Sequence, residues 1–148
     1  MKLVIVTDAW HPQTNGVVVT LSRTRDELEK LGHAVSVIGP DAFRTFPCPS
    51  YPEIRLALFA RRKLHAMLDG LGPNAVHIAT EGPLGLAARA WCRKRGFPFT
   101  TSFHTQFPEY IQLRTRIPVA LTYRWMRWFH APAATVMVAT PSLRRCLD

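Results

Sequence analysis

Residues 3–16 read LVIVTDAWHPQTNG and residues 17–32 read VVVTLSRTRDELEKLG, and this stretch decides the fold. Its first four residues are apolar and mostly β-branched, which is typical of a buried strand. From Val17 to Leu31 apolar residues recur at helical spacing, and Gly32 then suits the left-handed turn that commonly ends a helix. We therefore predict a strand, a polar loop and an amphipathic helix, in that order.

The same alternation of short apolar runs and longer helical patterns continues along the chain. Further strands are predicted at residues 34–39, 54–57, 75–79, 98–102 and 135–139. Helices are predicted at residues 61–71, 83–95, 108–113 and 118–130, with another from residue 141, whereas residues 40–52 hold four prolines and are predicted to be a loop. Parallel neighbours need crossover connections, so this order predicts an α/β fold, a Rossmann-like three-layer sandwich with a mostly parallel sheet.

The composition is that of a globular protein, with 47% apolar and 20% charged residues among 148. A chain of this length builds one good core, so a single domain over residues 1–148 is predicted. The helix that begins at residue 141 stops after about two turns without a C-cap, whereas globular helices average three or more. We therefore expect the chain to be part of a longer protein.

Cysteine usage and hydropathy predict the compartment. The three cysteines, Cys48, Cys92 and Cys146, are odd in number and widely spaced, which indicates reduced thiols in the cytoplasm rather than a disulfide framework or a zinc site. Asp8 ends the first apolar run too early for a signal peptide, and no stretch approaches the roughly 20 apolar residues that span a bilayer. No metal-ligand spacing is found among the His and acidic residues, so we expect neither a metal nor another cofactor.

The positive charge is concentrated in the second half of the chain. The net charge is +9, but residues 1–74 carry nine basic and seven acidic side chains, and residues 75–148 carry ten basic and three acidic ones. Arginine outnumbers lysine fifteen to four, which favours forked contacts with phosphate or carboxylate groups. An anionic partner is therefore expected.

Polar segments follow four of the predicted strands, at residues 8–16, 80–83, 103–106 and 140–142. The carboxyl ends of parallel strands meet at one edge of the sheet, where open α/β sheets bind their ligands. Asn15 and Gly16 stand directly before the first helix, so either the helix N-terminus binds a phosphate or Asn15 is simply its N-cap. The sequence lacks the glycine-rich motifs of dinucleotide sites and P-loops.

Two further side chains at this edge have alternative roles. His104 directly follows a predicted strand and is either a satisfied structural histidine or a catalytic one. Glu81 precedes Gly82 and Pro83, where it either caps the next helix or accepts a hydrogen bond from a sugar hydroxyl. The helix cap is the simpler of these two interpretations.

Residues 118–130 combine aromatic and basic side chains more densely than any other segment. Arg116, Ala120, Arg124 and Arg127 fall on one helical stripe, and Leu121, Trp125 and Trp128 or Phe129 fall on another. Either the aromatic residues pack on the sheet and the arginines face water, or the helix docks on anionic lipid headgroups. Nucleic acid is not expected as a partner, because no recognition-helix, RRM, KH or OB pattern is present.

Three of the polar segments together resemble a known family. They are DAWHPQTNGVV at residues 8–18, TEGPLG at residues 80–85 and SFHTQFPEY at residues 102–110. Their sequences and their order along the chain resemble those of the N-terminal, acceptor-side domain of family-four glycosyltransferases, which have the two-domain GT-B fold. Within that family the chain is most similar to bacterial GDP-mannose-dependent α-mannosyltransferases. The resemblance covers essentially the whole chain.

The resemblance implies roles for individual residues. Gly16, with its neighbour Asn15, matches the glycine whose backbone approaches the diphosphate of a nucleotide-sugar donor, and His104 matches a catalytic histidine near the transferred sugar. Asp8, Glu81 and Thr105 are candidate sugar or acceptor contacts. Arg116, Arg124 and Arg127 are candidate contacts with an anionic membrane surface. The protein is expected to lie in the cytoplasm, peripherally at the inner face of the membrane.

The family's members carry a second domain that binds most of the nucleotide sugar, and nothing in these 148 residues matches it. We therefore expect this chain alone to be inactive, and its activity as part of a longer protein to be the retaining transfer of a hexose, mannose from GDP-mannose, to a lipid or glycan. The alternative is a Rossmann-like module without enzymatic activity that binds anionic membranes.

Overall fold

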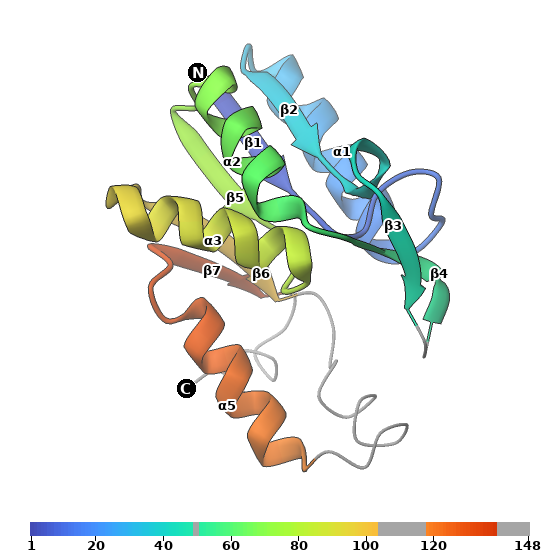
Figure 1. Ribbon diagram of the computed structural model, residues 1–148. Helices are drawn as coiled ribbons and strands as arrows, with labels where there is room; N and C mark the ends of the chain where they lie inside the picture. The colour runs from blue at the N-terminus through green and yellow to red at the C-terminus, as the bar shows by residue number, and fades with distance from the viewer. Residues whose placement is uncertain (49–50, 104–117, 139–148) are drawn as a thin grey trace.

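The computed structural model of this chain describes residues 1–48, 51–103 and 118–138, and its centre is a five-stranded parallel sheet (Figure 1). The strands lie in the order β2-β1-β5-β6-β7, and every neighbouring pair is parallel. Their bounds are β1 Lys2–Val6, β2 Ala34–Ile38, β5 Ala75–Ile78, β6 Phe99–Phe103 and β7 Thr135–Val138. The predicted α/β class and the mostly parallel sheet are thus confirmed.

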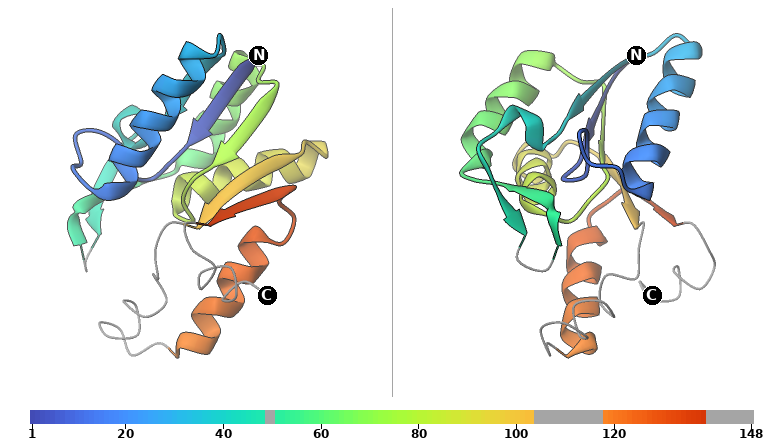
Figure 2. Two further views of the ribbon diagram at one scale, coloured as in Figure 1. Left: turned by 180° about the vertical axis from the view of Figure 1, so that it is seen from behind. Right: turned by 90° about the vertical axis from the view of Figure 1, so that its right-hand side faces the viewer.

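Helices cover both faces of the sheet, as Figure 2 shows. On one face lies α1, and on the other lie α2 and α3, with the end of α5 packed beside them. Their bounds are α1 Gly16–Lys30, α2 Ala60–Leu71, α3 Pro83–Arg95 and α5 Val119–His130. Within the described residues, no helix has the length and apolar character needed to cross a membrane.

Alternating side chains of β1 supply the two halves of the core. Ile5 packs with Val18 and Leu21 of α1, whereas Val4 and Val6 pack with residues of α2 and α3 on the other face. All five are buried. The continuous apolar run at the start of the sequence therefore becomes a strand that is covered on both faces.

The predicted loop over residues 40–52 is wrong. Residues Pro40–Ala42 form a short 3-10 helix, and β3 (Thr45–Cys48) and β4 (Tyr51–Ala57) pair in an antiparallel hairpin outside the main sheet. In a two-stranded ribbon each strand has one free edge, so a proline such as Pro47 removes no essential ladder bond when its nitrogen lies on that edge. Proline content is therefore a poor sign of a loop here.

The helix at residues 118–130 forms as predicted, but it buries a different face. Its buried side chains are Thr122, Met126, Phe129 and His130, at helical spacing. Leu121, Trp125 and Trp128 are instead exposed, at 55%, 38% and 52%. Arg89 of α3 fixes this orientation, because its guanidinium donates to the carbonyls of Trp128 and Phe129 and lies 3.8 Å from the centre of the Trp128 ring. The predicted helices at residues 108–113 and from 141 lie outside the described residues.

The order of the strands sets the place of the candidate site. From β1 the chain runs outward to β2, and after the hairpin and α2 it crosses back to β5 on the other side of β1. The order of the strands thus reverses between β1 and β5. Open α/β sheets bind ligands at this switch point, beyond the carboxyl ends of the strands.

Candidate functional site

Two polar loops are bonded to each other at the switch point between β1 and β5. The backbone N–H of Asp8 donates to Thr80 Oγ1 at 2.7 Å, and the Thr80 hydroxyl donates to Asp8 Oδ2 at 2.6 Å. Asp8 follows β1 and Thr80 follows β5, so residues 72 positions apart in the sequence become direct neighbours. The sequence-based expectation that these strand ends converge is met at this point.

The Asp8 carboxylate caps α3 from outside that helix. Oδ1 accepts from the Leu84 N–H at 2.9 Å and Oδ2 accepts from the Gly85 N–H at 3.4 Å. The N-cap residue itself, Gly82, contributes no side-chain bond, so Glu81 is not the cap and that interpretation is wrong. A negative charge at a helix N-terminus is stabilised by the free N–H groups and by the helix dipole.

Asp8 is also deeply buried, with 5% of its surface exposed. Burial raises the pKa of its carboxyl above the ordinary value of 3.8, and the hydrogen bonds from Thr80, Leu84 and Gly85 oppose that shift. Both carboxylate oxygens are engaged within the chain, so the structure places Asp8 as a support of the site. Its predicted contact with a sugar or acceptor stays a prediction.

Two glycines make this close packing feasible. A Cβ on Gly82 would lie 2.5 Å from the Asp8 carboxyl carbon, and one on Gly85 would lie 1.9 Å from the Thr80 carbonyl oxygen. Real Cβ atoms do not approach other atoms so closely. The GPLG part of the TEGPLG segment therefore has a packing function: it allows α3 to begin directly against the Asp8 loop.

The loop after β1 is held by its own polar side chains. Gln13, which is buried, donates from Nε2 to the Asp8 carbonyl and accepts at Oε1 from the Asn15 amide. Asn15 Oδ1 in turn accepts from the Val18 N–H at 3.1 Å, so Asn15 is the N-cap of α1. This was one of the two roles predicted for it, and it does not exclude a phosphate nearby.

Gly16 begins α1 and faces open space. It is exposed, and a Cβ built on it would meet no atom within 4 Å. The N–H groups of Val18 and Val19 are bonded to Asn15, whereas those of Gly16 and Val17 have no backbone or side-chain partner within the described residues. Free N–H groups at the positive end of a helix dipole are suited to an anion.

A third group at this edge was not predicted from the sequence. His130, the last residue of α5, is buried and lies between Thr101 of β6 and Glu81 of the loop after β5. Its Nδ1 is 2.7 Å from Thr101 Oγ1, and its Nε2 is 2.8 Å from Glu81 Oε1. No local pattern links these three residues, because only the crossover from β6 through α5 brings the helix end back beside β5.

The other predicted site residues are placed as follows. Arg124 and Arg127 are exposed on α5, next to the exposed Trp125 and Trp128. His104, Thr105 and Arg116 lie outside the described residues, so their roles stay predictions. Across residues 1–48, 51–103 and 118–138, no group of three or more His, Cys, Asp and Glu side chains is arranged to hold a metal ion.

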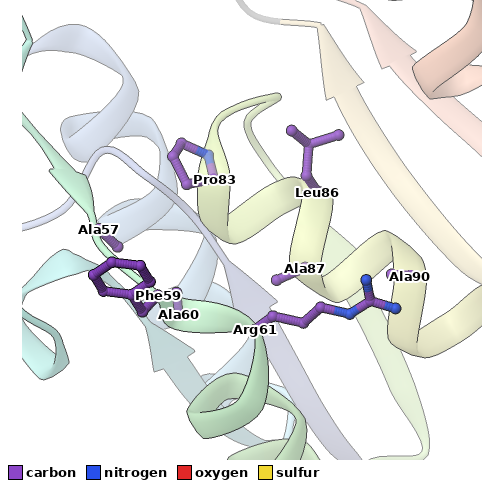
Figure 3. Close-up of a pocket in the computed structure, with 8 residues that line it drawn as sticks. All are labelled: Ala57, Phe59, Ala60, Arg61, Pro83, Leu86, Ala87 and Ala90. Carbon is purple, nitrogen blue, oxygen red and sulfur yellow. The ribbon is translucent and has the colours of Figure 1, made fainter.

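A shallow groove of about 270 Å³ lies between α3 and the start of α2. Figure 3 shows Pro83, Leu86, Ala87 and Ala90 of α3 on one side and residues from the end of β4 and the start of α2 on the other. Its lining is apolar except for Arg61, and Phe59 at its border is 96% exposed. A hexose site needs several convergent polar groups, so the candidate site is the switch-point edge and not this groove.

Comparisons with known proteins agree with this architecture. The model of Glycosyltransferase Family 4 matches residues 14–148. An alpha-monoglucosyldiacylglycerol synthase of Acholeplasma laidlawii is 31% identical, over 74% of this chain and 31% of its own length. GDP-mannose-dependent alpha-mannosyltransferases of Mycolicibacterium smegmatis and Mycobacterium tuberculosis are 26% and 27% identical, over 96% and 87% of this chain.

This chain spans less than half the length of each of those relatives, namely 43% of the first mannosyltransferase and 38% of the second. The family match, however, extends over nearly all of its own residues, from the end of the loop after β1 onward, and it includes the loop after β5. We conclude that the chain belongs to glycosyltransferase family 4.

Proposed function

We propose that this chain is the acceptor-side half of a retaining glycosyltransferase that moves a hexose from a nucleotide diphosphate sugar to a lipid. The observation that carries the proposal is the open start of α1 at the switch-point edge, where the loops after β1 and β5 are bonded to each other. The relatives support the chemistry, because they include a GDP-mannose-dependent alpha-mannosyltransferase and an alpha-monoglucosyldiacylglycerol synthase. Mannose from GDP-mannose is the donor sugar that we favour.

The donor's diphosphate would lie at the N-terminus of α1. The N–H groups of Gly16 and Val17 and the helix dipole would stabilise its negative charge, which grows as the sugar–phosphate bond breaks. The lack of a Cβ at Gly16 leaves the backbone open to close approach. A second domain would hold the rest of the nucleotide, so activity is expected of a protein that also contains that domain, without a metal or other cofactor.

The acceptor side would be formed by the loops after β5 and β6. Glu81 and Thr105 are the proposed contacts with sugar or acceptor hydroxyls, and His104 is the proposed catalytic residue next to the transferred sugar. Asp8 would act on this side indirectly, because it sets where α3 begins and thereby where Glu81 stands. Its two oxygens are already occupied within the chain.

A lipid acceptor requires that the enzyme reach a membrane, and α5 is the element that we propose for this contact. Trp125 and Trp128 are exposed beside the cationic Arg124 and Arg127, with Arg116 as a further candidate. Aromatic and basic side chains together are typical of helices that lie at the surface of anionic bilayers. The same surface would serve the alternative function, a membrane-binding module without catalysis.

The proposed activity is tested with the protein expressed at its full encoded length. Labelled GDP-mannose and, in parallel, UDP-glucose are supplied with a diacylglycerol acceptor, and label in the organic phase is measured. We expect one donor to label the lipid and His104→Ala to reduce that rate by about 100-fold. Absence of transfer from either donor, combined with binding to vesicles, would favour the module instead.

A further inference from the structure

His130 is held in a single orientation. Only 3% of its side chain is exposed, and both ring nitrogens have a partner within 2.8 Å. The rings of Phe129 and Phe103 pack edge-on against the imidazole, with centroids 5.1 and 6.0 Å away. Arg89 binds the carbonyls of the two preceding residues, so the end of α5 that carries His130 is itself anchored to α3.

The partners of His130 determine which nitrogen donates. An ionised carboxylate only accepts hydrogen bonds, so Nε2 carries a proton and donates to Glu81 Oε1. When the imidazole is neutral, Nδ1 accepts from the Thr101 hydroxyl, and when it is charged, Nδ1 donates to that hydroxyl. In both states the Nε2–H bond to Glu81 is present, and it is strengthened by the charge of the carboxylate.

The order of hydroxyl, imidazole and carboxylate resembles the triad of a hydrolase, but it cannot act as one. Thr101 is completely buried within β6, with 0% of its surface exposed. A nucleophile must reach the substrate, and no substrate can approach this hydroxyl. Thr101 therefore fixes the imidazole, and the accessible end of the group is Glu81.

Glu81 stands at the carboxyl edge of the sheet with 17% of its side chain exposed. One carboxylate oxygen, Oε1, is taken by His130. The other, Oε2, has no partner among the residues that the structure describes. A carboxylate oxygen that is free while its neighbour is fixed is well placed to accept a hydrogen bond from a ligand hydroxyl, and the fixed bond reduces the entropy lost on binding.

We propose that His130 is a positioning residue: it holds Glu81 so that Oε2 accepts a hydrogen bond from a hydroxyl of the sugar or polyol that enters the site. The identity of that hydroxyl rests on the proposed function, whereas the positioning is a property of this chain alone. His130 itself does not touch the substrate, because it is buried behind Glu81.

A matched pair of substitutions separates the two bonds of the imidazole. In His130→Gln the amide nitrogen falls near the position of Nε2 and keeps the bond to Glu81. In His130→Asn the shorter amide falls near Nδ1, so it keeps the bond to Thr101 and loses Glu81. Both variants remove the same ring from the core, so they are expected to lower the melting temperature similarly, and a difference between them reports on Glu81.

Hexose transfer by the full-length protein is the first measurement. We expect His130→Gln to keep kcat/KM for the acceptor within about threefold, and His130→Asn to lower it by about tenfold or more, as Glu81→Ala does. Adding His130→Asn to Glu81→Ala should cause no further loss. Equal losses in the Gln and Asn variants, or multiplied losses in the double variant, would overturn the proposal.

The second measurement does not depend on catalysis. Long-range ¹H–¹⁵N spectra of this chain should show the His130 proton on Nε2, and its resonance should move in Glu81→Gln. A proton found on Nδ1 alone would refute the positioning whether or not sugar is transferred. If the spectra agree but the full-length protein transfers no hexose, it is the proposed function that fails.

Discussion

Among single residues, the buried Asp8 carboxyl predicts how the stability of the fold depends on pH. Its pKa in the folded protein lies above the ordinary value of 3.8 because burial disfavours the charge. In the unfolded chain Asp8 has its ordinary pKa, so at pH values between that pKa and the raised pKa of the folded protein, the folded state binds the proton more tightly. The stability that this provides is complete below the unfolded pKa and is lost as the pH rises through the folded pKa.

We therefore expect the difference in the free energy of unfolding between the wild type and Asp8→Asn to fall as the pH rises from about 4 to about 8. Urea unfolding at several pH values measures it. Asp26→Asn, which replaces an exposed carboxylate on α1, is measured in parallel as the control. A difference that grows with pH would mean that the hydrogen bonds to Asp8 outweigh its burial.

The roles of Asp8 and Glu81 show what the sequence could and could not predict about single residues. Both lie at strand ends, and that placement at the edge of the sheet was predictable from the alternation of elements. Their roles were not, because Glu81 precedes α3 in the sequence whereas the carboxylate that caps α3 comes from the loop after β1. The cap forms because β1 and β5 are neighbours in the sheet, and short-range sequence patterns do not predict that adjacency.

At the scale of elements, α5 is the helix whose existence was predictable and whose buried face was not. Apolar side chains occur all round it, so its periodicity allows more than one face to be buried. The buried face is selected by the contacts of Arg89 with the end of α5 and of His130 with Thr101 and Glu81. These contacts leave Leu121, Trp125 and Trp128 exposed. The strand predicted at residues 54–57 is the second half of β4, but β3 and the hairpin pairing were missed, since an isolated ribbon tolerates prolines that a central strand would not.

The exposed face of α5 predicts binding to anionic membranes. We expect the chain to sediment with vesicles that contain phosphatidylglycerol and not with pure phosphatidylcholine vesicles. Each cation near an anionic surface contributes about 1 kcal/mol, so Arg124→Ala with Arg127→Ala should weaken binding about thirtyfold. Trp125→Ala with Trp128→Ala should weaken it on the same vesicles through lost apolar contact.

Two exposed cations of α1 supply the control for this experiment. Arg23→Ala with Lys30→Ala removes the same charge from the opposite face of the sheet and should change binding much less. If the α1 double variant binds vesicles as weakly as the α5 double variant does, the attraction depends on net charge alone. In that outcome α5 is not the docking element.

For the whole molecule, the fold class followed from the sequence while the topology did not. Alternating strand and helix patterns predict a parallel sheet with helices on both faces, and the sheet has that form. The order β2-β1-β5-β6-β7, and with it the switch point, depends on where each crossover returns. The concentration of positive charge after residue 74 is now partly explained, since Arg89 binds α5, Arg95 pairs with Asp69, and Arg124 and Arg127 stay exposed.

The start of α1 is the proposed binding site for the diphosphate of a sugar donor. The most direct test compares hexose transfer by full-length Gly16→Val and Gly70→Val, since a Cβ at either glycine meets no atom within 4 Å and both lie in helices. We predict that both variants fold, that Gly70→Val transfers like the wild type, and that Gly16→Val loses about tenfold or more in kcat/KM for the donor. Equal transfer by the Gly16→Val variant and the wild type would contradict the claim.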